Sequence, residues 1–122
     1  MLQLRALSRN EQQEIERILE LDLETLYAEL GQQIGVLAPG SNAESQARKW
    51  INSRRQKLYE LICIKGSYCD FIKQNRNANT VQIVAAVGDL LATALGVLPV
   101  NTLSALLFRT SLDRFCNCSK ED

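Results

Sequence analysis

Four cysteines could do the most distinctive chemistry in this chain: Cys63, Cys69, Cys116 and Cys118. Four thiolates can hold a tetrahedral zinc ion, but zinc sites usually present two CxxC pairs, and neither pair here has that spacing. The chain opens without the apolar run of a secretory signal, which predicts a cytoplasmic protein with reduced cysteines. We therefore expect buried thiols, with Cys118 the most exposed of the four. Disulfides or a redox role are the second alternative, and a zinc site is the third.

Histidine is absent from the sequence. Its absence removes the commonest general base and the commonest metal ligand, and it excludes Ser-His-Asp and Cys-His catalysis within this chain. The glycine-containing stretch 35–40 lacks the Lys-Ser/Thr ending of a phosphate-binding loop. The carboxylates of the first helical segment are spread around it, as on a solvated face. The sequence therefore predicts a protein that is not an enzyme, with no catalytic residue, no cofactor and no metal site.

Apolar residues recur in steps of three and four along most of the chain, which indicates helices. Ser8 and Glu11 form a capping box, and Ser41 and Glu44 form a second one. No stretch alternates with period two for long enough to indicate a strand. We expect an all-α fold, a compact antiparallel bundle of four to six helices that ends in an apolar helical hairpin.

The 122 residues suit one helical domain, 1–122. Its expected parts are an acidic helical segment 8–35, a loop 36–42, a basic amphipathic helix 42–64, a short helix and linker 65–79, an apolar hairpin 80–116 and a polar tail 117–122. Leu21 and Leu23 break the apolar stripe of the first segment and flank Asp22. The segment is therefore either one bent helix or two short ones, and the sequence does not decide between them.

The formal net charge is zero, with 14 basic and 14 acidic side chains, but the charges are segregated. Residues 1–40 carry three basic and seven acidic side chains, whereas residues 41–76 carry eight basic and three acidic ones. The acidic and basic helices can lie side by side and partly neutralise each other. Alternatively, the acidic face binds a basic partner, or the basic face, which includes Arg48, Arg54 and Arg55, binds an acidic one. Nucleic acid is not expected, because no stacking aromatics interleave with these arginines.

Residues 90–108 carry no charge and reach the length of a membrane-spanning candidate. Gly96 and Pro99 interrupt this stretch, and a window shifted to avoid them has Asp89 at its centre, which is costly in a bilayer. Gly88, Ala92 and Gly96 recur every four residues, a pattern that lets two helix backbones approach closely. The partner of that small-residue face is either another helix of this chain or a second copy.

The leading functional hypothesis is a non-enzymatic helical protein-interaction module, a small cytoplasmic adaptor or accessory subunit. It would act by self-association or by binding a larger partner, through Gly88, Ala92 and Gly96 or through Arg48, Arg54 and Arg55. The alternative is a membrane-active, toxin-like effector that uses the apolar hairpin 80–108, in which Asp89 is neutralised or faces a pore. A protein partner or a homo-oligomer is expected, and a membrane is a less favoured partner.

Overall fold

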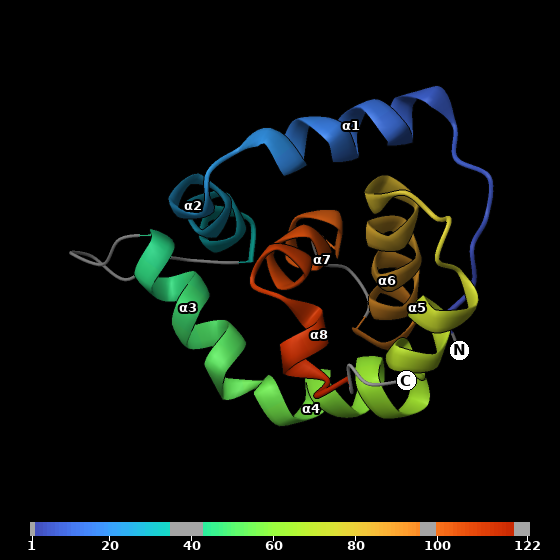
Figure 1. The fold of residues 1–122 in the computed structure, drawn as a ribbon. Coiled ribbons are helices and arrows are strands. Elements are labelled where there is room, and N and C mark those ends of the chain that lie inside the picture. Colours follow the sequence, from blue (N-terminus) through green and yellow to red (C-terminus); the bar gives the residue numbers. More distant parts are fainter. Residues whose placement is uncertain (1, 35–42, 96–99, 119–122) are drawn as a thin grey trace.

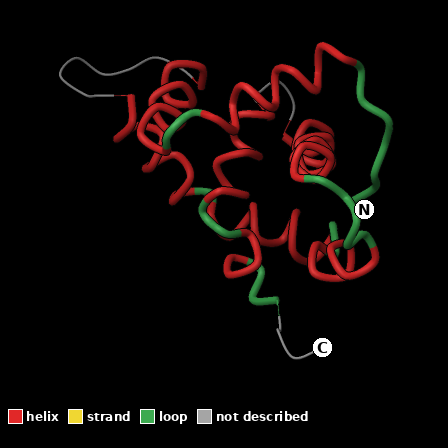
Figure 2. Tube along the Cα trace, turned by 45° about the horizontal axis from the view of Figure 1, so that its top comes forward, coloured by secondary structure: helices red, strands yellow, loops and turns green. Residues whose placement is uncertain are grey.

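The computed structural model describes residues 2–34, 43–95 and 100–118, and within these ranges the chain is helical with no strand (Figure 2). The all-α prediction is confirmed. The elements are α1 (Arg9–Glu20), α2 (Leu23–Ile34), α3 (Ala43–Ser53), α4 (Arg55–Tyr59), the π-helix η1 (Glu60–Lys65), α5 (Tyr68–Gln74), α6 (Thr80–Leu95), α7 (Val100–Arg109) and α8 (Leu112–Phe115). Short helices make this series longer than the four to six helices expected from the sequence.

The first acidic segment forms two helices, which decides the alternative left open above. The predicted capping box is present: the Ser8 hydroxyl accepts from the Glu11 backbone N–H, and the Glu11 carboxylate accepts from the Ser8 N–H. Leu21 is extended, with ψ 150°, and ends α1. The Asp22 carboxylate then accepts a 2.8 Å hydrogen bond from the Thr25 backbone N–H and starts α2.

The basic segment is broken, contrary to the single helix expected over 42–64. Its first α-helix, α3, ends at Ser53, and Arg54 adopts φ −113° and ψ 14° before α4 begins. The last six residues, Glu60–Lys65, wind as a π-helix. Breaks of this kind bend a helix away from a straight course. The bend lets α3 follow α2 while η1 reaches the opposite end of the molecule (Figure 1).

The apolar helices α6 and α7 form the centre of the molecule, with α1 along one side and the α3–α4 segment along the other (Figure 1). The buried Ser104 hydroxyl donates a 2.7 Å hydrogen bond to the Val84 carbonyl, which joins α7 to α6. The predicted hairpin 80–116 also includes residues 96–99, which lie outside the described residues. No helix among the described residues is both long enough and apolar enough to cross a bilayer.

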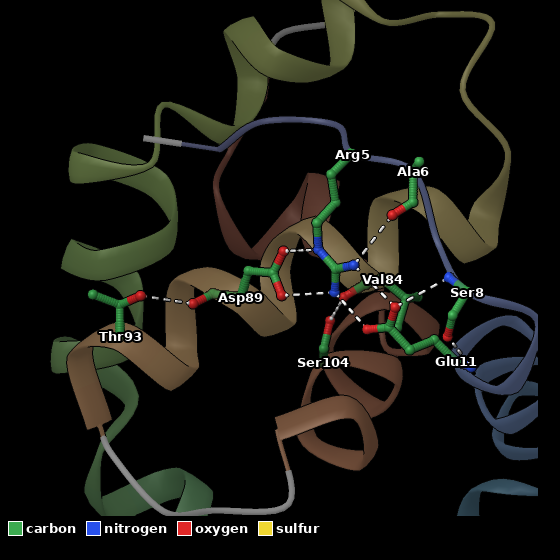
Figure 3. Close-up of polar contacts among 8 residues, drawn as sticks. All are labelled: Arg5, Ala6, Ser8, Glu11, Val84, Asp89, Thr93 and Ser104. Carbon is green, nitrogen blue, oxygen red and sulfur yellow. Dashed lines mark hydrogen bonds and ion pairs between the residues drawn. The ribbon is translucent and has the colours of Figure 1, made fainter.

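The N-terminal arm, residues 2–8, is tied to α6 and α1 by one arginine (Figure 3). Arg5 binds both carboxylate oxygens of Asp89, at 2.6 and 3.1 Å, and both of Glu11, at 2.6 and 3.0 Å. Hydrogen bonds from Arg5 and from the Ser8 N–H lower the pKa of Glu11 to about 2. Asp89, the charge that interrupts the apolar region, therefore has a partner within the chain.

The prediction of free cysteine thiols is wrong. Cys63 is bonded to Cys116 and Cys69 to Cys118, with Cα–Cα separations of 5.2 and 5.4 Å, and no cysteine is free. Cys118, expected as an exposed thiol, is half-buried in one of these bonds. The partners lie 53 and 49 residues apart in sequence, so only the tertiary fold brings them together. Both bonds attach the segment after α8 to η1 and α5.

Candidate functional site: an arginine-lined pocket

A cavity of about 370 Å³ opens between the basic segment and the C-terminal part of the chain. Five helices and the α7–α8 turn contribute to its wall. The lining residues are Tyr27, Arg48, Ile51, Asn52, Arg55, Leu106, Leu107, Thr110, Ser111, Arg114 and Phe115. We refer to this cavity as the arginine pocket.

Part of the wall of the arginine pocket is formed by buried apolar side chains of α3 and α7. Ile51, Leu106 and Leu107 are buried, because the amphipathic faces of these helices turn toward the core. Tyr27 of α2 and Phe115 of α8 are half-buried and add aromatic surface. A ligand in the pocket would therefore meet apolar surface as well as charge.

The guanidinium groups of Arg48, Arg55 and Arg114 also line the arginine pocket, and no carboxylate of the described residues does. Arg48 is committed to Glu44, one turn earlier in α3, with Nε–Oε2 and Nη2–Oε2 distances of 3.0 and 2.9 Å. Within the described part of the chain, Arg55 and Arg114 form no ion pair. Since arginine stays protonated in proteins, the pocket holds two positive charges that no carboxylate of the described residues pairs with.

Aromatic rings lie close to two of these cations. The guanidinium carbon of Arg48 lies 4.0 Å from the centre of the Tyr27 ring, and that of Arg55 lies 5.5 Å from the centre of the Phe115 ring. Such contacts hold a guanidinium plane in place while leaving its edge N–H groups available. The pocket therefore presents partly oriented donors rather than freely mobile chains.

Two further polar side chains of the lining have hydrogen-bonding capacity to spare. The Asn52 amide and the Ser111 hydroxyl have no hydrogen-bond partner among the described residues. Thr110 differs, because its hydroxyl donates to the carbonyls of Leu106 and Leu107, at 3.0 and 3.2 Å. Ser111 has φ 77°, in the left-handed region, and this residue makes the turn from α7 into α8. The turn brings Arg114 and Phe115 to the pocket wall.

The structure brings together part of the predicted basic set. Arg48 and Arg55 line the arginine pocket, but Arg54 does not. Its guanidinium carbon lies 4.5 Å from the centre of the Trp50 ring, and it donates a 3.0 Å hydrogen bond to the Ser53 hydroxyl. Arg54 lies at the break between α3 and α4, where its side chain contacts Trp50 and not the pocket.

The predicted small-residue face is divided between different surroundings. Gly88 is buried, and a Cβ on it would lie 2.9 Å from the Asn101 amide oxygen and 3.9 Å from the Ser104 Cβ. It therefore serves the contact of α6 with α7 inside the chain. Ala92 is exposed on α6, and Gly96 lies outside the described residues.

Sequence reasoning missed Tyr27, Arg114 and Phe115 as site residues. Arg114 and Phe115 lie in a four-residue helix with no periodic signal of its own, and Tyr27 lies in the acidic segment. The one available signal was the pair of cysteines just after Phe115, which would have fixed α8 beside the basic segment had a disulfide been assumed.

Comparison with protein-family models, curated proteins and solved structures found no match for this chain.

Proposed function

We propose that this protein is a non-enzymatic helical interaction module, a small adaptor or accessory subunit that binds an acidic segment of a larger protein at the arginine pocket. The observation that carries the proposal is the pair Arg55 and Arg114, two cations without an ion-pair partner in the described chain beside buried apolar surface. Charge-assisted hydrogen bonds from arginine to an oxyanion are the strong ones in proteins. An acidic residue next to an apolar one fits this lining.

A protein partner suits the arginine pocket better than nucleic acid does. The chain has no net charge, whereas binding along a phosphate backbone draws on an extended basic surface. A cavity of about 370 Å³ accommodates one or two side chains rather than a duplex. The pocket is therefore suited to an anchor residue of a peptide segment.

Self-association and membrane activity have weaker support. Gly88, the first residue of the proposed self-association face, lies against α7 of its own chain. Asp89, whose charge suggested a pore or a neutralisation step, is paired with Arg5. Each hypothesis therefore loses part of its support.

Two disulfides bear on the location in which the module would act. The sequence predicted a cytoplasmic protein, but cytosolic thiols are normally kept reduced, and structural disulfides persist in oxidising compartments. We therefore favour an oxidising compartment for the folded form with both bonds, Cys63–Cys116 and Cys69–Cys118. Thiol titration of the denatured protein distinguishes the two locations: protein taken from its native compartment should release no free thiol, and four thiols would support the cytoplasm.

The proposed function is tested with a fluorescein-labelled peptide that alternates glutamate with phenylalanine, followed by fluorescence anisotropy. The double variant R55A/R114A removes the two cations of the pocket that have no ion-pair partner among the residues that the structure describes. The matched control R54A/R76A removes two cations that lie outside it. We expect at least a tenfold loss of affinity for the first variant and less than threefold for the control. Equal losses would show non-specific attraction and would refute the assignment of the pocket.

A further inference from the structure

We propose that the group bound in the arginine pocket is a phosphate monoester on an apolar stem, presented by a phosphorylated side chain of the partner. This inference rests on the proposed function and specifies the chemistry of its ligand. A small organic phosphate carries the same group, so the experiment below includes both sources.

The charge of the arginine pocket matches a phosphate monoester. Such a group carries about −1.5 to −2 charges near neutral pH and presents three acceptor oxygens. Arg55 and Arg114 supply two positive charges that no carboxylate of the described chain neutralises. Both guanidinium groups are exposed, and a single carboxylate would compensate only one of the two charges, whereas a dianion can compensate both. Two cations per bound group therefore favour phosphate over carboxylate.

The hydrogen-bonding groups of the pocket point to the same chemistry. Each guanidinium offers a planar fork of N–H donors that pairs with two phosphate oxygens at once. Asn52 and Ser111 add neutral donors that have no other partner among the described residues. A group with three oxygens can use this set more fully than a group with two.

The dimensions and the apolar lining indicate what the phosphate is attached to. A cavity of about 370 Å³ is larger than a phosphate group alone needs. The remaining space adjoins buried Leu106 and Leu107 and the half-buried rings of Tyr27 and Phe115. An aromatic stem would fill this space and gain from ring contacts. A phosphorylated tyrosine side chain, or an aryl phosphate, therefore satisfies both parts of the pocket.

A second basic hollow on the same protein provides an internal contrast. It lies along α4 and η1 and is lined by Arg54, Lys57 and Lys65, together with the carboxylate of Glu60 and the buried Leu61. The Glu60 carboxylate reduces the attraction of this hollow for a dianion, and no aromatic side chain of the described residues lines it. If the phosphate-bearing ligand bound in this hollow and not in the arginine pocket, its binding would depend on local positive charge alone.

The experiment compares three probes on the wild-type protein by isothermal titration calorimetry. The probes are a phosphotyrosine peptide, the same peptide with glutamate in place of phosphotyrosine, and phenyl phosphate. We expect the phosphopeptide to bind at least tenfold more tightly than the glutamate peptide, and R55A/R114A to abolish this difference. We expect R55K, which keeps the charge but loses the planar fork, to weaken phosphopeptide binding at least fivefold. Circular dichroism confirms that each variant is folded.

The outcomes separate this inference from the function on which it rests. Equal binding of the glutamate peptide and the phosphopeptide, both dependent on Arg55 and Arg114, would overturn the phosphate inference and leave the proposed function standing. Phenyl phosphate binding as tightly as the phosphopeptide would support the phosphate site but overturn a protein source. Binding of none of the probes would overturn both.

The pH dependence gives an independent readout of the phosphate. The second pKa of a phosphate monoester is about 6, whereas a glutamate carboxyl titrates near 4.3. Binding of the phosphopeptide should therefore weaken at least threefold between pH 7 and pH 5, while binding of the glutamate peptide should change little. Two parallel profiles would contradict a phosphate dianion as the preferred ligand.

Discussion

The two disulfides should stabilise the fold in a strongly non-additive way. In the chain-entropy account, a bond that closes a loop of 53 or 49 residues restricts the unfolded chain by about 4 kcal/mol. When one bond is already present, the second closes only a ring of about eight residues, through Cys63–Cys69 and Cys116–Cys118, and adds about 2.5 kcal/mol. Breaking either bond alone should therefore cost much less than breaking the last one.

The perturbations are the paired variants C63A/C116A and C69A/C118A and the variant with all four changes. We expect each paired variant to lose about 2.5 kcal/mol of unfolding free energy and the fourfold variant to lose about 6.5 kcal/mol. The second figure is a large share of the 5–15 kcal/mol typical of a domain. Urea unfolding followed by circular dichroism measures each value.

Loss of packing around the buried Cys116 could add to the entropic effect. The control is to repeat the series with excess dithiothreitol, where wild type and variants all lack disulfides and differ only in the side chains removed. Losses of about 4 kcal/mol for each pair, adding to about 8 kcal/mol, would refute the nested-loop reasoning. A wild-type protein whose stability is the same with and without the reductant would refute the disulfides themselves.

Two further predictions concern packing and charge. G31A should lower the free energy of unfolding in urea by more than about 2 kcal/mol, because the new Cβ would collide with backbone atoms of Ala43 in α3. G88A should lower it by less, because the new Cβ meets the end of the Asn101 side chain, which can move. An equal effect of the two changes would contradict the packing. R5A removes the ion pairs of Arg5 with Glu11 and Asp89. It should lower the melting temperature at pH values above 4.5, the ordinary pKa of Glu11. The difference from wild type should shrink as the pH falls from 4.5 toward 2, because protonation of Glu11 removes its ion pair, and a difference independent of pH would contradict this.

Local signals predicted much of the fold. The Ser8 capping box starts α1 where it was expected. Asp22 starts α2, as expected if the acidic segment forms two short helices and not one bent helix. The two apolar helices α6 and α7 pack at the centre, with Ser104 hydrogen-bonded to the Val84 carbonyl. These features depend on residues within one or two helical turns, or on overall hydrophobicity, which a sequence shows directly.

The errors concern features that depend on distant contacts. The π-helix at Glu60–Lys65 has an apolar pattern that also suits an α-helix, so the sequence does not distinguish the two. The cysteine pairing joins segments about 50 residues apart, and the assumption of a reducing compartment directed the prediction toward thiols. Local propensity contains no information about such pairs.

The candidate site was half predictable for the same reason. Arg48 and Arg55 were identified from the charge cluster of the basic segment, which is a local property. Arg114 completes the pocket from a helix far along the chain, and its place is fixed by the turn at Ser111 and the bonds that follow α8. A pocket that combines both segments exists only in the folded chain.

The central claim is that the guanidinium groups of Arg55 and Arg114 bind one oxyanion together. Arginine side-chain NMR tests it directly, by following the Nε–H signals of all arginines as phenyl phosphate is added. We expect the signals of Arg55 and Arg114 to shift together along one saturating curve, and the signal of Arg54 to stay in place. Small shifts shared by all exposed arginines, without saturation, would contradict the claim, because they would indicate only diffuse attraction of the anion to the surface.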